Sequence, residues 1–197
     1  MTSAGRHRST TIRSACLAVV ISLSSLFVAN SATACISIER LELGDVKFAD
    51  VVVIGRVANY RLILDPEARE RNRQMVTKMR PSKLRDSLSN ISGFITDYAR
   101  FDIQVEEVLQ GQAPEIIEAT WDNSTFGEPE KMPSGPFVIA LRRSDSDRPP
   151  LRGPSATIVP NREPQLLTVL QAPCSMPFMF ELGGEQAQAL LEALKAK

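Results

Sequence analysis

The alternation of apolar and polar residues along the chain predicts a protein built mainly of β-strands. The first predicted strand covers residues 49–64 and is rich in β-branched side chains. Apolar residues occupy both of its faces: Val51, Val53 and Val57 share one, and Val52 and Ile54 share the other. Gly55 in the middle of this segment predicts a bend or bulge of the kind that small barrels use at their corners.

Four later segments continue the β pattern. Residues 96–112 alternate most clearly, with one apolar and one polar face, and residues 115–122 carry the only tryptophan of the chain. Residues 136–143 and 165–173 are the fourth and fifth predicted strands. Five short strands joined by polar turns favour a closed barrel.

The end of the chain changes to a helical period after two glycines. Ala187, Leu190, Leu191 and Leu194 fall at positions i, i+3, i+4 and i+7, which predicts an amphipathic helix over residues 185–197. We expect its apolar face to cover the core of the barrel.

A charged insertion separates the first two strands, over residues 65–90. Asp65-Pro66 predicts the start of a helix, and Pro81 predicts its end or interruption. The insertion contains the basic residues Arg69, Arg71, Arg73, Lys78, Arg80, Lys83 and Arg85. They indicate either a patch for an anionic partner, such as lipid headgroups or polysaccharide, or simply a solvated segment. The segment has no aromatic residue, which argues against stacking on nucleic-acid bases.

The first 34 residues are typical of a secretory signal peptide. Arg6, Arg8 and Arg13 precede an apolar run, and Ala32-Thr33-Ala34 supplies the small residues of a cleavage site. We therefore expect cleavage before Cys35 and a secreted or periplasmic product, in which residues 35–197 form a single domain.

Composition excludes several classes of function for the processed chain. Its only histidine, His7, belongs to the signal peptide, so Ser-His and Cys-His nucleophile pairs and His-ligated zinc are excluded. Removing three basic residues from a neutral chain leaves a slightly acidic one, which does not favour nucleic acid. The sequence thus predicts a protein that is not an enzyme and that uses no cofactor or metal.

Cys35 is open to three interpretations as the first residue of the processed chain. It can carry a lipid, although Ala32 stands where a larger aliphatic residue is expected. It can bind a metal through its new α-amino group. It can also form a disulfide with Cys174, which is the only other cysteine after processing and would be oxidised in an exported protein.

The order of these features resembles the tissue inhibitors of metalloproteinases and the netrin-like domains, in a bacterial type of relative. The resemblance rests on the cysteine after a signal peptide and on the segments ADVVVIGRV, ARFDIQVEEVLQG and GPFVIALRR. It implies a five-stranded OB-like Greek-key barrel with a charged insertion after the first strand and a C-terminal helix. It also implies an inhibitory N-terminus, in which Cys35 chelates the zinc of a target protease and Ile36 enters its specificity pocket. Ser37 stands where the family has a second cysteine.

The prediction for function is an exported, non-catalytic binding module of the cell envelope that interacts with a protein or a glycan. One alternative is an inhibitor of zinc metalloproteases that acts through Cys35. Another is a lipid-anchored envelope protein. Contact with a membrane would require either that lipid or the basic insertion.

Overall fold

The computed structural model describes residues 39–122, 128–152 and 158–195. The chain divides by its internal contacts into two units, Met1–Ala32 and Thr33–Lys197, and every described residue belongs to the second unit. The segment predicted to be a signal peptide, together with Cys35 and Ile36, precedes residue 39 and lies outside the described residues.

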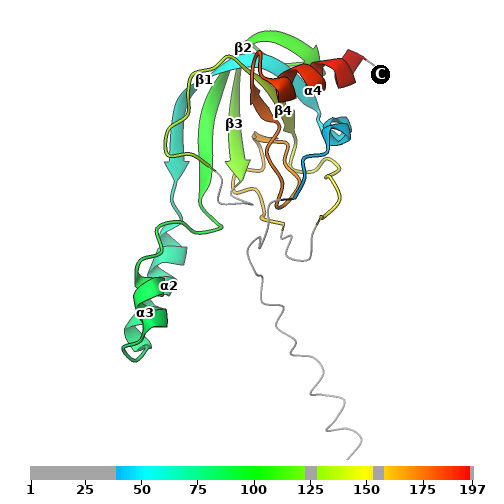
Figure 1. Cartoon of the computed structure of the whole chain (residues 1–197). Coiled ribbons are helices and arrows are strands. Elements are labelled where there is room, and N and C mark those ends of the chain that lie inside the picture. The colour runs from blue at the N-terminus through cyan, green and yellow to red at the C-terminus, as the bar shows by residue number, and fades with distance from the viewer. Residues whose placement is uncertain (1–38, 123–127, 153–157, 196–197) are drawn as a thin grey trace, which may run out of the picture. The chain divides into compact units, whose positions relative to one another are not determined.

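The strands of the second unit form one sheet that closes on itself (Figure 1). They are β1 (Val51–Ile63), β2 (Tyr98–Gln110), β3 (Ile116–Asp122), β4 (Phe137–Arg142), β5 (Leu167–Val169) and β6 (Met179–Glu181). The order is β1-β2-β3-β5-β4-β6, and β4 also pairs with β1, which closes the first five strands into a barrel. The prediction of a mainly β, five-stranded OB-like barrel is confirmed.

The first strand, β1, can pair with both β2 and β4 because it bends at a glycine. Val51–Gly55 pair with β4, whereas the whole length of β1 from Val52 onward pairs with β2, with a register shift between Ile54 and Gly55. A Cβ atom on Gly55 would lie 2.6 Å from the carbonyl oxygen of Gln104. Only glycine allows the two backbones to approach this closely, and the predicted bend at Gly55 is confirmed.

Apolar side chains from one face of the strands fill the barrel. This interior core contains Val51, Val53, Val57, Ala99, Phe101, Ile103, Ile117, Ala119, Trp121, Phe137, Ile139, Leu141 and Val169. The alternation of β2 places Ala99, Phe101 and Ile103 inside, as its sequence pattern predicts.

A second core lies on the outer face of β1 and β4. There Val52, Val138 and Ala140 pack against the C-terminal helix α4 (Glu185–Lys195) and the short 3-10 helix η2 (Leu43–Phe48). Ala187 and Leu190 of α4 are buried, which confirms the predicted amphipathic helix. The helix covers the outside of the barrel rather than its interior, and this explains why both faces of β1 are apolar.

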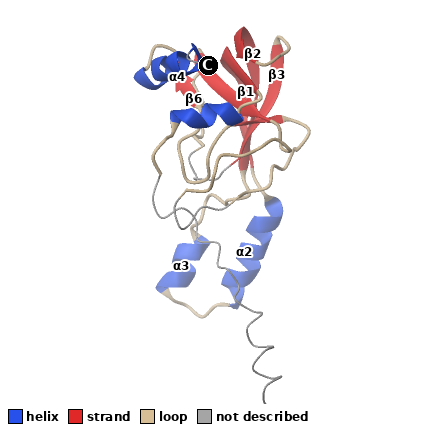
Figure 2. Cartoon of the chain, turned by 90° about the vertical axis from the view of Figure 1, so that its right-hand side faces the viewer, coloured by secondary structure: helices blue, strands red, loops and turns tan. Residues whose placement is uncertain are grey.

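The charged insertion folds as two helices, α2 (Pro66–Lys78) and α3 (Lys83–Ser89), which we call the hairpin (Figures 1 and 2). Asp65 caps α2, because its carboxylate accepts hydrogen bonds from the amides of Glu67 and Ala68 at 2.9 and 3.0 Å. The predicted start at Asp65-Pro66 and the interruption at Pro81 are therefore confirmed. Both views show the hairpin projecting from the barrel.

Two strands differ from the sequence prediction. The fifth strand covers only Leu167–Val169, shorter than the predicted 165–173, although the amide of Leu170 still donates to the carbonyl of Ala140 in β4 at 2.8 Å. The sixth strand, β6, has only three residues and carries no period long enough to be recognised.

Candidate functional site

The base of the hairpin is held by a partly buried ion pair. Arg69 of α2 donates to both carboxylate oxygens of Asp97, with distances of 2.6 Å from Nη1 to Oδ1 and 2.9 Å from Nη2 to Oδ2. The same carboxylate accepts the backbone amides of Asp65 at 2.7 Å and Phe94 at 2.9 Å. One buried aspartate therefore joins the start of α2, the end of the insertion and the barrel.

Further contacts close this base around Arg69. Its guanidinium group lies 4.9 Å from the centre of the Phe94 ring and donates to the carbonyl of Ser92 at 2.9 Å. Arg162, from the loop that precedes β5, contacts Asp65 with an Nη2–Oδ2 distance of 3.1 Å. Burial alone would raise the pKa of Asp97, but the hydrogen bonds from Arg69 and from the two amides outweigh burial and hold that pKa below its usual value.

The seven predicted basic residues all lie on the hairpin, but they play different parts there. Arg69 is engaged at the base, Arg71 pairs with Glu67 at 3.5 Å, and Arg73 pairs with Glu70 at 2.5 Å. Lys78, Arg80, Lys83 and Arg85 form no ion pair with any residue in the part of the chain that the structure describes. The uncompensated positive charge is therefore concentrated in residues 78–85, which we call the hairpin tip.

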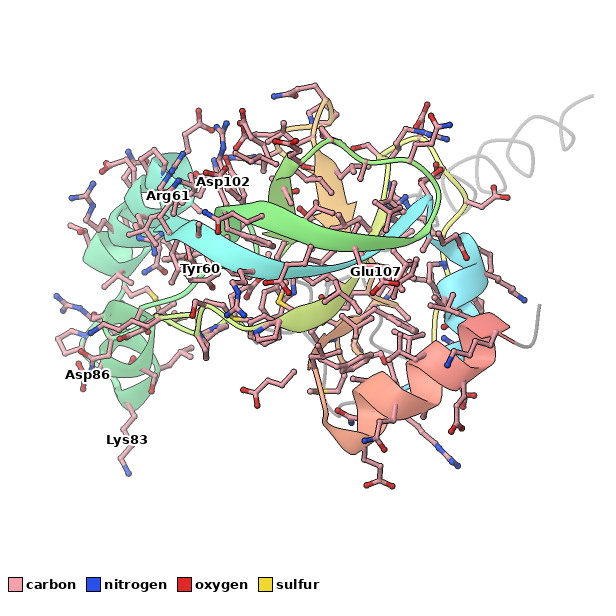
Figure 3. All side chains as sticks on the ribbon, turned by 90° about the horizontal axis from the view of Figure 1, so that it is seen from above. Tyr60, Arg61, Lys83, Asp86, Asp102 and Glu107 are labelled. Carbon is pink, nitrogen blue, oxygen red and sulfur yellow. The ribbon has the colours of Figure 1, made fainter. Side chains whose placement is uncertain are left out.

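Exposed apolar side chains lie on the hairpin tip and next to it. Leu84 is 60% exposed and Met75, one helical turn before the tip, is 49% exposed. No residue of α3 is buried, and Ala68 at the base is the only buried residue of α2. Figure 3 shows the Lys83 side chain extending away from the ribbon, with Asp86 beside it. The hairpin therefore gains little from burial of its own and depends on its base for its position.

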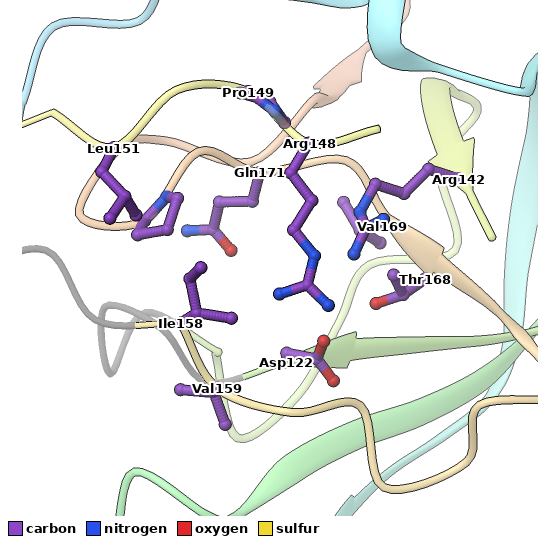
Figure 4. Close-up of a pocket in the computed structure, with 11 residues that line it drawn as sticks. Asp122, Arg142, Arg148, Pro149, Leu151, Ile158, Val159, Thr168, Val169 and Gln171 are labelled. Atoms are coloured by element: carbon purple, nitrogen blue, oxygen red, sulfur yellow. The ribbon is translucent and has the colours of Figure 1, made fainter. Parts of the chain in front are cut away.

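A separate cavity of about 70 Å³, with polar and apolar side chains in its lining, lies where the end of β3 and the strands β4 and β5 meet residues 148–151 and 158–159 (Figure 4). Asp122, Arg142 and Arg148 line it, and the Arg148 side chain points toward Asp122. Arg142 is buried and donates to the carbonyls of Arg143 and Ser146 at 2.7 and 3.0 Å. The cavity has room for water or a small ion.

Two carboxyl groups near this end of the barrel are partly buried and have lost part of their hydration. Burial raises the pKa of Asp122 to about 6, although Arg142 and Arg148 oppose that rise. Burial also raises the pKa of Glu128 to about 8, and the charges of Asp122 and Asp97 add to the effect. Among the described residues, Asp122 Oδ1 and Glu128 Oε1 are buried oxygens without a hydrogen-bond partner. A hydrogen bond with Thr168 lowers the pKa of Asp122, and a hydrogen bond with its own backbone lowers that of Glu128, but in both groups the loss of hydration outweighs these contacts.

Cys174 is buried beside the start of the described chain. The amide of Glu39 donates to the carbonyl of Cys174 at 2.6 Å, and Glu39 forms an isolated parallel bridge with Ser175. Cys174 is 1% exposed and has a positive φ of 66°, which is uncommon for a residue with a side chain. These contacts bring the segment that follows Cys35 and Ile36 to Cys174, while Cys35 and Ile36 themselves lie outside the described residues.

Sequence reasoning identified the tip residues but not the base or the cavity. Asp97 and Arg162 are single charged residues in loops, and the sequence gives no signal that they meet Arg69 and Asp65. Asp122, Arg142 and Arg148 likewise come from two strand ends and a loop, and only the fold brings them together.

Searches for a metal site, for a membrane-spanning helix and for similar proteins complete the description of the site. Within residues 39–122, 128–152 and 158–195, no group of three or more His, Cys, Asp or Glu side chains is placed to hold a metal ion. No helix in that same part of the chain is long and apolar enough to cross a bilayer. No family model, curated protein or solved structure matches the chain.

Proposed function

We propose that the chain is an exported, non-catalytic binding module of the cell envelope, and that the hairpin tip is its binding surface. The N-terminal pattern of basic residues, apolar run and small residues supports export. The processed sequence contains no histidine, which supports a role in binding rather than in nucleophilic catalysis. The barrel is then the support from which the hairpin is presented.

The observation that carries this proposal is the contrast between the two ends of the hairpin. The base is fixed by Asp97, which is 6% exposed and makes four hydrogen bonds to Arg69 and to backbone amides. No residue of the tip is fully buried, and the tip presents four cations without acidic partners among the described residues. A rigid attachment reduces the conformational entropy that binding at the tip would cost.

The charge of the tip supports a partner that is anionic. Glu67 and Glu70 pair with Arg71 and Arg73, whereas the cations of residues 78–85 form no ion pair among the described residues, although Asp86 directly follows the tip in the sequence. Exposed cations of one sign attract a partner of the opposite sign over a distance of about 10 Å at moderate salt. We infer that the partner is an anionic component of the envelope.

We also propose that Cys35 and Cys174 form a disulfide. The Glu39–Cys174 hydrogen bond supports it, because the four Cα-to-Cα steps from residue 35 to residue 39 span at most about 14 Å and a bridge needs the two Cα atoms within about 7 Å. The resemblance to the metalloproteinase-inhibitor and netrin-like families is kept as a proposal, and the OB-like barrel is the fold that this resemblance implies.

Retention on isolated cell envelopes tests the proposed function. Ile63 and Tyr98 are paired across β1 and β2, so an Asn-Gly turn can replace residues 64–97 and remove the hairpin. We expect this variant to keep the circular dichroism of the barrel and to lose at least about tenfold in retention, as expected when the main binding element is absent. If the shortened chain fails to fold, the double variant Arg80→Gln/Lys83→Gln replaces it. Unchanged retention of either folded variant contradicts the proposal.

A further inference from the structure

We propose that the hairpin tip binds the surface of a lipid bilayer that contains anionic headgroups. This inference rests on the proposed function and identifies the anionic component that the tip recognises. It follows from three properties of the tip: its uncompensated charge, its exposed apolar side chains, and its distance from the barrel.

The charge is confined to the part of the hairpin that reaches farthest from the barrel. Lys78, Arg80 and Lys83 are exposed, and Arg85 is partly exposed. Nearer the base, Arg71 and Arg73 are matched by Glu67 and Glu70 on the same helix. Each basic residue close to an anionic bilayer strengthens binding by about fivefold, so four of them give a substantial attraction.

The apolar side chains distinguish a bilayer from other anionic partners. Leu84 lies between Lys83 and Arg85 and is 60% exposed, and Met75 is 49% exposed. A polysaccharide or a nucleic-acid backbone offers them no apolar surface, and the segment has no aromatic residue for stacking on bases. At a bilayer they can enter the boundary between headgroups and acyl chains, while long basic side chains keep their charges among the headgroups.

The attachment of the hairpin makes this contact possible without involving the barrel. Figures 1 and 2 show α2 and α3 extending from one end of the barrel, with the turn between them as the most distant part. The Arg69–Asp97 pair fixes the direction of α2 at the other end. The tip can therefore reach a flat surface before the barrel does.

Sedimentation with vesicles tests the proposal. The exported chain is mixed with vesicles made of equal parts phosphatidylglycerol and phosphatidylcholine, and with vesicles of phosphatidylcholine alone. We expect binding to the anionic vesicles only, weakened at high salt. The variant Arg80→Gln/Lys83→Gln should bind about 25-fold more weakly, and Leu84→Asn about tenfold more weakly.

The control is Arg71→Gln/Arg73→Gln, which removes the same number of charges from α2 where they are already paired. We expect it to weaken binding by less than about threefold. Equal effects of the two double variants would overturn the role of the tip, and so would equal binding to neutral vesicles.

Two further outcomes separate this inference from the function on which it rests. In the first, the protein binds a soluble sulfated polysaccharide but no vesicles, and Arg80→Gln/Lys83→Gln weakens this binding whereas Leu84→Asn does not. That result would identify the partner as a polyanion and overturn the proposal of a lipid surface. Absence of vesicle binding, together with hairpin-dependent retention on whole envelopes, also overturns the lipid surface but leaves the proposed binding function in place.

Discussion

Arg69 and Asp97 are 28 residues apart in the sequence and meet as a two-point ion pair at the base of the hairpin, with the shorter Nη1–Oδ1 distance at 2.6 Å. The Asp97 side chain is 8% exposed and that of Arg69 is 25% exposed. Because Asp97 also accepts two backbone amides, the pair couples the position of α2 to the first residues of β2. The direction of the hairpin therefore depends on this one carboxylate.

Replacing that carboxylate should destabilise the protein strongly. Asp97→Ala leaves a partly buried guanidinium group and two amides without their acceptor, and we expect the free energy of unfolding to fall by about 3 kcal/mol. Urea denaturation followed by circular dichroism measures the change. The control is Arg71→Gln, which breaks an exposed pair and should cost less than about 0.5 kcal/mol. Similar small losses in both variants would mean that the base is not rigid.

The same carboxylate predicts a loss of stability in acid. The pKa of Asp97 is lower in the folded protein than in the unfolded chain, so its contribution is present above the unfolded value, 3.8, and is lost as the pH falls through the lower folded value. We expect the free energy of unfolding to decrease below about pH 4, and to decrease less steeply in Asp97→Asn. Urea curves at a series of acidic pH values provide the measurement. An identical acid slope in the two proteins would assign the effect to other carboxylates.

Glu128 predicts the opposite dependence on pH. Its pKa rises from 4.5 to about 8 on folding, so the unfolded chain loses its proton first and the protein loses stability as the pH rises between these values. Glu128→Gln removes the ionisable group, and we expect it to stabilise the protein by about 2 kcal/mol at pH 9, a figure reduced for the partial contact of Glu128 with water. At pH 4 the two proteins should be nearly equal. Thermal unfolding of both proteins at both pH values tests this. The prediction is contradicted if the stability difference between the variant and the native chain is no larger at pH 9 than at pH 4.

The strands of the barrel could be predicted because their signals are local. In β2 the alternation of Ala99, Phe101 and Ile103 with polar residues follows directly from the two faces of a strand that borders a filled barrel. The C-terminal helix has the same advantage, since Ala187 and Leu190 repeat at the helical period. The sequence pattern does not predict the surface on which that helix packs. The face of β1 that includes Val52 has the same apolar pattern whether a helix or another sheet covers it.

The candidate site could be predicted only in part. The basic residues of the tip are neighbours in the sequence, so their charge was visible. Their partners were not, because Glu67 and Glu70 neutralise Arg71 and Arg73 only when a helix places them one turn apart. The base of the hairpin was still harder to predict from the sequence, because Asp97 is brought to Arg69 only by the pairing of Ile63 with Tyr98 across β1 and β2.

The bend of β1 predicts a specific intolerance at Gly55. In Gly55→Ala the new methyl group would lie 2.6 Å from the Gln104 carbonyl oxygen and 2.7 Å from Cγ2 of Ile103. We expect a loss of about 2–3 kcal/mol in the free energy of unfolding, because a backbone carbonyl cannot move aside without breaking the β1–β2 ladder. Gly44→Ala is the matched control, since nothing lies within 4 Å of its new Cβ atom. A Gly55→Ala protein as stable as Gly44→Ala would show that β1 and β2 can separate at this point without cost.

The proposed disulfide makes a prediction that a merely packed cysteine does not. A bridge between Cys35 and Cys174 acts mainly by restricting the unfolded chain, and the chain-entropy model gives about 5 kcal/mol for a loop this long. Cys35→Ser, Cys174→Ser and the double variant should then lose the same amount of stability in urea without reductant, because each removes the same single bond. If Cys174 contributes only through packing of its buried side chain, Cys35→Ser will change nothing and the double variant will match Cys174→Ser. A peptide map of the purified chain, prepared without reductant, distinguishes the two cases directly, since only the bridge joins the peptides of residues 35 and 174.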